Sequence, residues 1–210
     1  MLDGSMEIVE IDVVTGKKNT FVATSRRALR ALNKAKVPFA VIDATALGAR
    51  GLPRFTKDLD LVVTNDDAWE ALDALEHVGF RSAAPVDRSS DPEPMYVLSH
   101  GTGEVDLLVT SGEPESSVIA EATAADLFGV RVPVATLEHL VLMYLYSNQP
   151  RHQGDLARIV TETKVDLAEV ERYLADVHPE MLATLQMRVE LSRHPPPAPP
   201  RPTKQRTKRK

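Results

Sequence analysis

The chain has 210 residues, of which 43% are hydrophobic, and a formal charge of −5 at pH 7. This length suits one domain with an appendage or two small domains, and the apolar share is enough for a core. The chain has no cysteine, which excludes disulfides, thiolate metal sites and cysteine nucleophiles. No apolar run approaches the length of a membrane helix, and the acidic N-terminus lacks the pattern of a signal peptide. We therefore expect a cytoplasmic protein with no membrane partner.

The charge is unevenly distributed. Residues 194–210 contain six lysines and arginines, six prolines and no acidic residue. Proline cannot continue a helix, and this segment has no sizeable apolar side chain to bury, so we predict a disordered basic tail. Such a tail could be a solubilising appendage or a tether for nucleic acid, because exposed positive charge attracts any polyanion. The remainder of the chain is correspondingly acidic.

The first two-thirds of the chain alternate helical and strand patterns. After a Thr24 or Ser25 cap, apolar residues recur at helical spacing, which predicts a helix over 25–36. The further expected elements are a strand at 39–42, a helical turn at 45–50, a strand at 57–63, a helix that ends at Gly79, a loop at 82–93, and a hairpin of strands 95–100 and 104–109.

The pattern changes after Gly112. Residues 116–125 are weakly helical and residues 130–134 form a short extended piece. Four helices follow, at 137–147 after a Thr136 cap, at 152–163, at 167–177 and at 179–192. The chain therefore predicts an α+β fold divided into an N-terminal extension (1–20), an α/β domain (21–135), a C-terminal helical subdomain (136–193) and the tail (194–210).

Three aspartates stand out in the two longest predicted strands. Side chains alternate faces along a strand, so Asp58 and Asp60 share one face. Asp106 occupies the equivalent place in the strand at 104–109. Three carboxylates on adjacent strands repel one another unless a cation lies between them, and oxygen ligands suit Mg²⁺. The alternative is that these are surface aspartates at strand edges.

The stretch around these aspartates resembles a known family. Residues 40–63 are similar to the signature of the DNA-polymerase-β-type nucleotidyltransferase superfamily. In its minimal bacterial branch, a strand leads to a Gly-Gly or Gly-Ser turn, a small helix and an Arg-x-Thr-x-Asp-x-Asp motif. The matching residues here are Ala46, Gly51, Arg54, Thr56, Asp58 and Asp60. Residues 132–143 and the segment that begins at Asp155 resemble the C-terminal helices of that branch, which includes abortive-infection toxins of toxin–antitoxin pairs.

The resemblance implies a nucleotidyltransferase-type mixed sheet flanked by helices and a Mg²⁺-dependent activity. Such an enzyme transfers a nucleotide from an NTP to a hydroxyl of RNA or tRNA, of a protein or of a small molecule, and a toxin would have a cognate antitoxin. Asp58 and Asp60 would hold two Mg²⁺ ions, and Asp106, also a metal ligand, would activate the attacking hydroxyl. The expected nucleotide-binding residues are Ala44, Thr45, Arg54 and Thr56.

Two residues depart from the family pattern. Asp43 stands in the turn that should approach the triphosphate, where its carboxylate would repel phosphate. Tyr144 stands near the position where relatives usually carry a lysine, and a tyrosine cannot neutralise phosphate. These departures favour an alternative function, in which a catalytically weakened module of this fold uses the basic tail to bind RNA or a partner protein.

Overall fold

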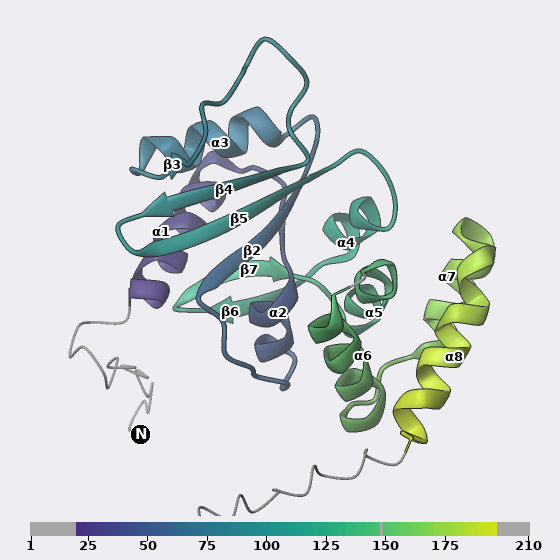
Figure 1. Ribbon diagram of the computed structural model, residues 1–210. Coiled ribbons are helices and arrows are strands. Elements are labelled where there is room, and N and C mark those ends of the chain that lie inside the picture. The colour runs from purple at the N-terminus through teal and green to yellow at the C-terminus, as the bar shows by residue number, and fades with distance from the viewer. Residues whose placement is uncertain (1–19, 148, 197–210) are drawn as a thin grey trace, which may run out of the picture.

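The computed structural model describes residues 20–147 and 149–196 (Figure 1). In this part of the chain seven strands form one mixed sheet in the order β3-β4-β5-β2-β1-β7-β6. The strands are β1 (Ala40–Val41), β2 (Asp58–Thr64), β3 (Arg81–Ser82), β4 (Met95–His100), β5 (Gly103–Thr110), β6 (Thr123–Leu127) and β7 (Val130–Val134).

The centre of the sheet is the pair β2 and β5, which run parallel over their full lengths. β1 joins β2 in antiparallel orientation and β7 in parallel orientation. Along β5, buried and half-buried residues alternate strictly, as expected of a strand with one face on the core. Leu59, Leu61, Val105 and Leu107 form the buried rows of these two strands. The opposite rows begin with acidic side chains, Asp58 and Asp60 on β2 and Glu104 and Asp106 on β5, and continue with Val62 and Leu108.

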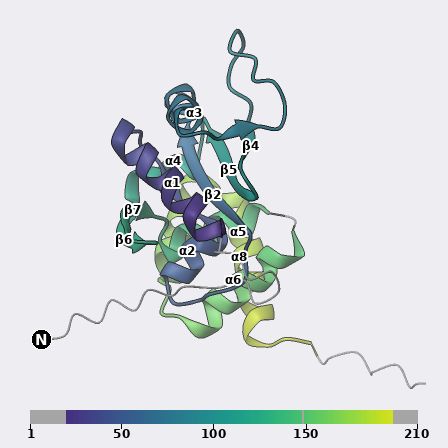
Figure 2. The same ribbon diagram turned by 90° about the vertical axis from the view of Figure 1, so that its left-hand side faces the viewer.

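Helices cover both faces of the sheet. They are α1 (Thr20–Ala35), α2 (Asp43–Ala49), α3 (Ala68–His77), α4 (Glu115–Glu121), α5 (Leu137–Tyr146), α6 (Pro150–Glu162), α7 (Leu167–Val177), the short 3₁₀ helix η1 (Pro179–Met181) and α8 (Leu182–Arg193). α1 and α3 pack together on the Leu59 side, and α2 lies on the other side of β2, next to α5 (Figures 1 and 2). α6, α7 and α8 pack beyond α5 and against one another.

The close approach of α1 to β5 depends on a glycine. A Cβ atom built on Gly103 would overlap the side chain of Thr24, which is buried in α1. Only a residue without a side chain lets the helix and the strand come this close. Gly103 thus sets the depth at which α1 packs on the sheet.

Most expected elements are present. The helix at 167–177 has the predicted bounds, and Thr136 caps α5 by accepting a hydrogen bond from the backbone N–H of His139. α1 begins five residues before the expected start. The prediction of a helix through residue 125 is wrong, because residues 123–127 form β6, the antiparallel edge partner of β7. The division into domains stays a prediction, and most of the expected tail, from residue 197, lies outside the described residues.

The described helices are also informative about membranes. None of those in residues 20–147 and 149–196 combines the length and the apolar character that crossing a bilayer requires. The most apolar of them, α5, has ten residues and is largely buried between other elements.

Candidate active site

The register of β2 and β5 places four carboxylates on one face of the sheet. Asp58 is the partner of Glu104, and Asp60 is the partner of Asp106. Because partners on parallel strands point to the same side, all four side chains project from the face opposite the Leu59 row. Asp58, Asp60 and Asp106 were expected to share one face of the sheet, and the register places them there. Glu104 lies on the same face. Sequence parity alone could have identified Glu104, since it lies two residues before Asp106.

Three of these carboxylates are close enough to share an ion. One oxygen each of Asp58, Glu104 and Asp106 lies within 4.8 Å of the others. Asp60 is not in this cluster, but its Oδ2 atom and Oδ1 of Asp106 are buried and have no hydrogen-bond partner among the described residues. Buried carboxylate oxygens without partners are costly, and an oxygen-only set of ligands suits Mg²⁺ or Mn²⁺. The residues present therefore fit a divalent cation.

The electrostatics of the site give the same indication. Burial, followed by the charges of Asp43, Asp58 and Asp106, raises the pKa of Asp60 to about 8. Burial and the neighbouring carboxylates of Asp58 and Glu104 also raise the pKa of Asp106. Carboxylates that repel one another in this way hold protons until a cation compensates their charge.

Two basic residues act on the carboxylates from nearby. The positive charge of Arg151, which lies in the first turn of α6, offsets part of the rise in the pKa of both Asp60 and Asp106, and Lys57 does so for Asp106. Arg151 is exposed, and none of the hydrogen bonds and ion pairs among the described residues involves it. It is therefore available to an anionic ligand that binds at the carboxylates.

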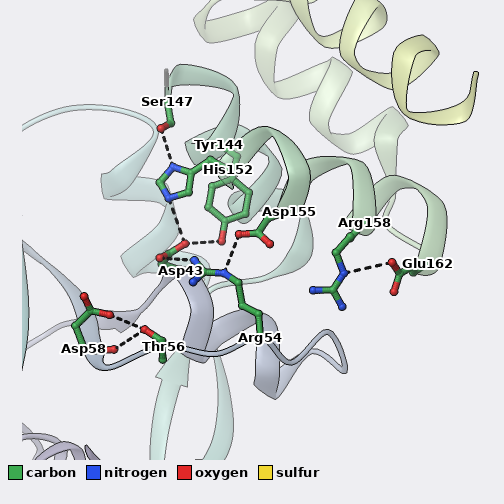
Figure 3. A network of polar contacts seen from close by, with 10 residues as sticks. All are labelled: Asp43, Arg54, Thr56, Asp58, Tyr144, Ser147, His152, Asp155, Arg158 and Glu162. Carbon is green, nitrogen blue, oxygen red and sulfur yellow. Dashed lines mark hydrogen bonds and ion pairs between the residues drawn. The ribbon is translucent and has the colours of Figure 1, made fainter. Parts of the chain in front are cut away.

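Beside the carboxylates lies a buried set of polar contacts that we call the Asp43 network: Asp43, Arg54, Tyr144, His152 and Asp155 (Figure 3). Asp43 Oδ2 accepts a hydrogen bond from Arg54 at 2.7 Å, and its Oδ1 accepts one from the Tyr144 hydroxyl at 2.8 Å. His152 Nε2 lies 3.5 Å from the same Oδ1, and the imidazole stacks on the Tyr144 ring with 4.7 Å between centroids. Asp43 is the first residue of α2, and its side chain does not cap that helix.

The backbone of Asp43 is also unusual. Its φ of +49° lies in the left-handed region, which glycine adopts freely and aspartate tolerates better than most residues. Although burial opposes ionisation, the hydrogen bond and charge of Arg54 outweigh it and lower the pKa of Asp43. The chain therefore holds an ionised aspartate in a conformation that favours glycine.

Arg54 lies between two carboxylates. Besides Asp43, it pairs with Asp155 of α6, with 2.8 Å between Nε and Oδ2. The N–H direction does not meet hydrogen-bond geometry in this second contact, so the attraction is one of charge. Burial disfavours the cation, but the two aspartates outweigh it and raise the pKa of Arg54.

Comparisons with known proteins were made with the sequence and with the fold. No family model matches the chain, and no curated protein matches it. Among solved structures, the antibiotic-resistance factor ANT(2'')-Ia in solution superimposes with a TM-score of 0.52 at 18% identity, over 82% of this chain and 95% of that one. A proposed nucleotidyltransferase of Thermotoga maritima gives 0.49 at 16% identity, over 74% and 92%, and the lincosamide adenylyltransferase LnuA gives 0.48 at 13%, over 67% and 97%.

The chain has the minimal nucleotidyltransferase fold. The predicted mixed sheet with flanking and C-terminal helices is confirmed. In this nucleotidyltransferase fold, the four carboxylates lie on the central strand pair and the Asp43 network lies at the start of α2.

The residues expected to bind a nucleotide lie in different surroundings. Ala44 and Thr45 are buried in the first turn of α2, and the Thr45 hydroxyl has no hydrogen-bond partner in the described part of the chain. Arg54 is engaged by its two aspartates. The Thr56 hydroxyl donates to Asp58 Oδ1 at 2.5 Å and so orients a candidate metal ligand. The nucleotide-binding role of all four residues stays a prediction.

Proposed function

We propose that this protein is a metal-dependent nucleotidyltransferase that transfers a nucleoside monophosphate from an NTP to a hydroxyl group. The single observation that carries the proposal is the register of β2 and β5, which gathers Asp58, Asp60, Glu104 and Asp106 on one face of a sheet of the nucleotidyltransferase fold.

Divalent cations are the expected cofactor of this site. Asp58, Asp60 and Asp106 would hold one or two Mg²⁺ ions, with Glu104 completing the Asp58–Asp106 cluster. The bound cations would neutralise charge on the phosphate oxygens and on the departing pyrophosphate. Thr56 fixes the carboxylate of Asp58 by its hydrogen bond, and oriented ligands of this kind strengthen a metal site.

Asp106 is the residue best placed to take up a proton. During transfer, the acceptor oxygen forms a bond to the α-phosphorus, the bond from that phosphorus to the bridging oxygen breaks, and pyrophosphate leaves. The acceptor hydroxyl loses its proton in the same reaction. The pKa of Asp106 is raised by burial and by its acidic neighbours, and a raised pKa makes a carboxylate a better proton acceptor near neutral pH.

The nucleotide phosphates need positive charge besides the metal. Arg151 supplies it, because it is exposed, has no ion-pair partner among the described residues and acts electrostatically on Asp60 and Asp106. The buried Thr45 hydroxyl, which has no partner among the described residues, adds a hydrogen-bond donor at the start of α2. These two residues take the place of a lysine at position 144.

The acceptor is a small molecule, an RNA such as tRNA, or a protein. ANT(2'')-Ia is named as an antibiotic-resistance factor, which supports testing hydroxyl-bearing small molecules first. If the acceptor is an RNA or a protein, we propose that the enzyme acts as a toxin in the cytoplasm and is controlled by a cognate antitoxin.

The test combines binding and transfer. Calorimetry with Mg²⁺ and each NTP should show binding that Asp58→Asn weakens, and labelled nucleotide should pass to one of the three acceptor classes. Binding of no NTP by wild-type protein in the presence of Mg²⁺ or Mn²⁺ would contradict the proposal.

A second candidate function follows from the Asp43 network. Asp43 puts a carboxylate beside the site, and Arg54, which could bind phosphate, is held by two aspartates. These contacts support a catalytically weakened module that keeps the fold and binds RNA or a partner protein. In that case RNA or the partner binds with unchanged affinity to Asp58→Asn, and no label is transferred.

A further inference from the structure

The first two turns of α6 are attached to the rest of the molecule at two points. Asp155 pairs with Arg54, which belongs to the loop before β2, at 2.8 Å. His152 stacks on Tyr144 and lies 3.5 Å from Asp43. Figure 3 shows that His152 and Asp155 both reach from α6 into the Asp43 network. The start of α6 is thereby fixed to the start of α2 and to the loop that leads into the carboxylate strand.

Arg151 lies just before both of these attachments in the chain. It directly precedes His152 and lies four residues before Asp155. Residues four apart lie on the same face of a helix, so the face that Asp155 holds against Arg54 also carries Arg151. Arg54 lies four residues before Asp58 in the loop that leads into β2, so this face of α6 is turned toward the strand that carries Asp58 and Asp60.

A buried ion pair is weak evidence for a role in stability. Removing the charges from water costs most of the free energy that their attraction provides. Apolar side chains of similar volume often stabilise a protein equally well. What an arginine between two carboxylates does provide is a defined geometry, because a guanidinium has a planar array of donors. Asp155 is buried, and its contact with Arg54 joins two segments about a hundred residues apart in the chain.

We propose that Asp155 is a positioning residue, which through Arg54 holds the first turn of α6 so that Arg151 faces the four carboxylates and binds the phosphates of the nucleotide. The inference rests on the proposed function, since it assigns the nucleotide phosphates as the ligand of Arg151. Asp155 itself touches neither the nucleotide nor the metal in this arrangement.

The test is a double-mutant cycle on the full chain. Calorimetry would measure the Kd of the Mg²⁺ complex of α,β-methylene-ATP for wild type, Arg151→Gln, Asp155→Asn and the double variant. Arg158→Gln is the matched control, because Arg158 pairs with Glu162 at 3.3 Å on the exposed side of the same helix (Figure 3). Thermal melting of each variant would separate loss of position from loss of stability.

Asp155→Asn should weaken nucleotide binding by about 10- to 100-fold, as residues that orient a ligand group commonly do. Adding it to Arg151→Gln should cause no further loss, because Asp155 acts through Arg151. Asp155→Glu, which restores the charge, should recover part of the affinity, and Arg158→Gln should bind as wild type does.

Wild-type affinity in Asp155→Asn, or a double variant whose loss is the product of the two single losses, would overturn the inference while leaving the proposed function intact. If wild type itself binds no nucleotide, the proposed function and this inference both fall. Should Asp155→Asn not fold, Arg54→Lys replaces it in the same cycle, with the same two outcomes deciding.

Discussion

Asp60 and Asp106 are register partners on the parallel strands β2 and β5, and each keeps one buried carboxylate oxygen for which the described residues offer no hydrogen-bond partner. Residues paired across parallel strands project side by side from the same face. Two carboxylates in that relation repel each other, so the pair needs either a bound proton or a cation to compensate its charge. The chemistry of the site therefore originates in strand register rather than in a loop.

The first prediction concerns proton transfer. Asp106→Asn should lower the rate of nucleotide transfer by about 10²–10⁴-fold, because the amide cannot accept the proton of the attacking hydroxyl. Transfer of labelled nucleotide under saturating Mg²⁺ and NTP would measure it. Glu104→Gln is the control on the same strand, and its smaller loss should be recovered at higher Mg²⁺. Equal losses in the two variants would remove the special role of Asp106.

The second prediction concerns pH and metal removal. The pKa of Asp60 is raised from 3.8 to about 8 by burial and neighbouring charges, so the folded protein binds more protons than the unfolded one between these values. Stability of the metal-free protein should therefore fall as pH rises from about 4 to 8. In EDTA, Asp60→Asn should melt above wild type at pH 8, by several degrees, since each pKa unit corresponds to about 1.4 kcal/mol.

The control for this prediction is the same pair of proteins at pH 3, below both pKa values, where Asp60 is largely protonated in both states and the difference should nearly disappear. Adding Mn²⁺ at pH 8 should reverse the order, because only wild type gains a full set of ligands. A wild-type melting temperature that rises with pH over this range in EDTA would contradict the assignment of Asp60 as the strained carboxylate.

Much of the fold was predictable from local patterns. The helix at 167–177 and the strands around Asp58 and Asp106 follow from apolar spacing, which local sequence carries directly. β6 was not predicted, because Thr-Ala-Ala-Asp-Leu has neither the β-branched content nor the alternation of a typical strand. It forms as an edge strand through its pairing with β7, a tertiary contact that a local pattern does not contain.

The site was predictable only where it depends on local sequence, as was the fold. Strand parity placed Asp58 and Asp60 on one face and suggested Asp106, whereas the pairing of Glu104 with Asp58 depends on a register that no local pattern specifies. The Asp43 network joins α2, α5 and α6. Arg54 was expected to bind the nucleotide, and only the packing of α6 brings Asp155 to it.

The third prediction concerns the packing of α1. Gly103→Ala should destabilise the protein by about 1–3 kcal/mol, because its Cβ would overlap the buried Thr24 side chain and force α1 away from β5. Urea unfolding would measure the loss. Gly112→Ala is the matched control, since nothing lies within 4 Å of a Cβ at that position. Adding Thr24→Ala to Gly103→Ala should restore part of the stability, and a failure to do so would mean that the collision is not with Thr24.

The last prediction concerns Asp43, whose carboxylate lies beside the site in a conformation that favours glycine. Asp43→Gly relieves the left-handed backbone strain, worth about 1–2 kcal/mol. It also leaves the buried Tyr144 hydroxyl without its acceptor, a cost of about 1–3 kcal/mol, so the net stability should fall slightly. Arg54 keeps Asp155 as a partner but gains a free side toward any incoming phosphate.

Nucleotide affinity should respond in the opposite direction. Asp43 is the neighbouring charge that contributes most to raising the pKa of Asp60, so its removal should favour both the ionised metal ligand and an anionic substrate. A nearby like charge costs about 1–4 kcal/mol at intermediate dielectric, and Asp43→Gly should therefore tighten binding of Mg²⁺-ATP by roughly tenfold or more.

Calorimetry at two salt concentrations would measure this change, and the gain should be smaller at high salt because screening weakens the repulsion. Asp43→Asn is the control, since it keeps a hydrogen-bond acceptor for Tyr144 and removes only the charge. If both variants bind Mg²⁺-ATP as wild type does, Asp43 does not act on the nucleotide. The weakened-enzyme alternative then loses the electrostatic argument that motivates it.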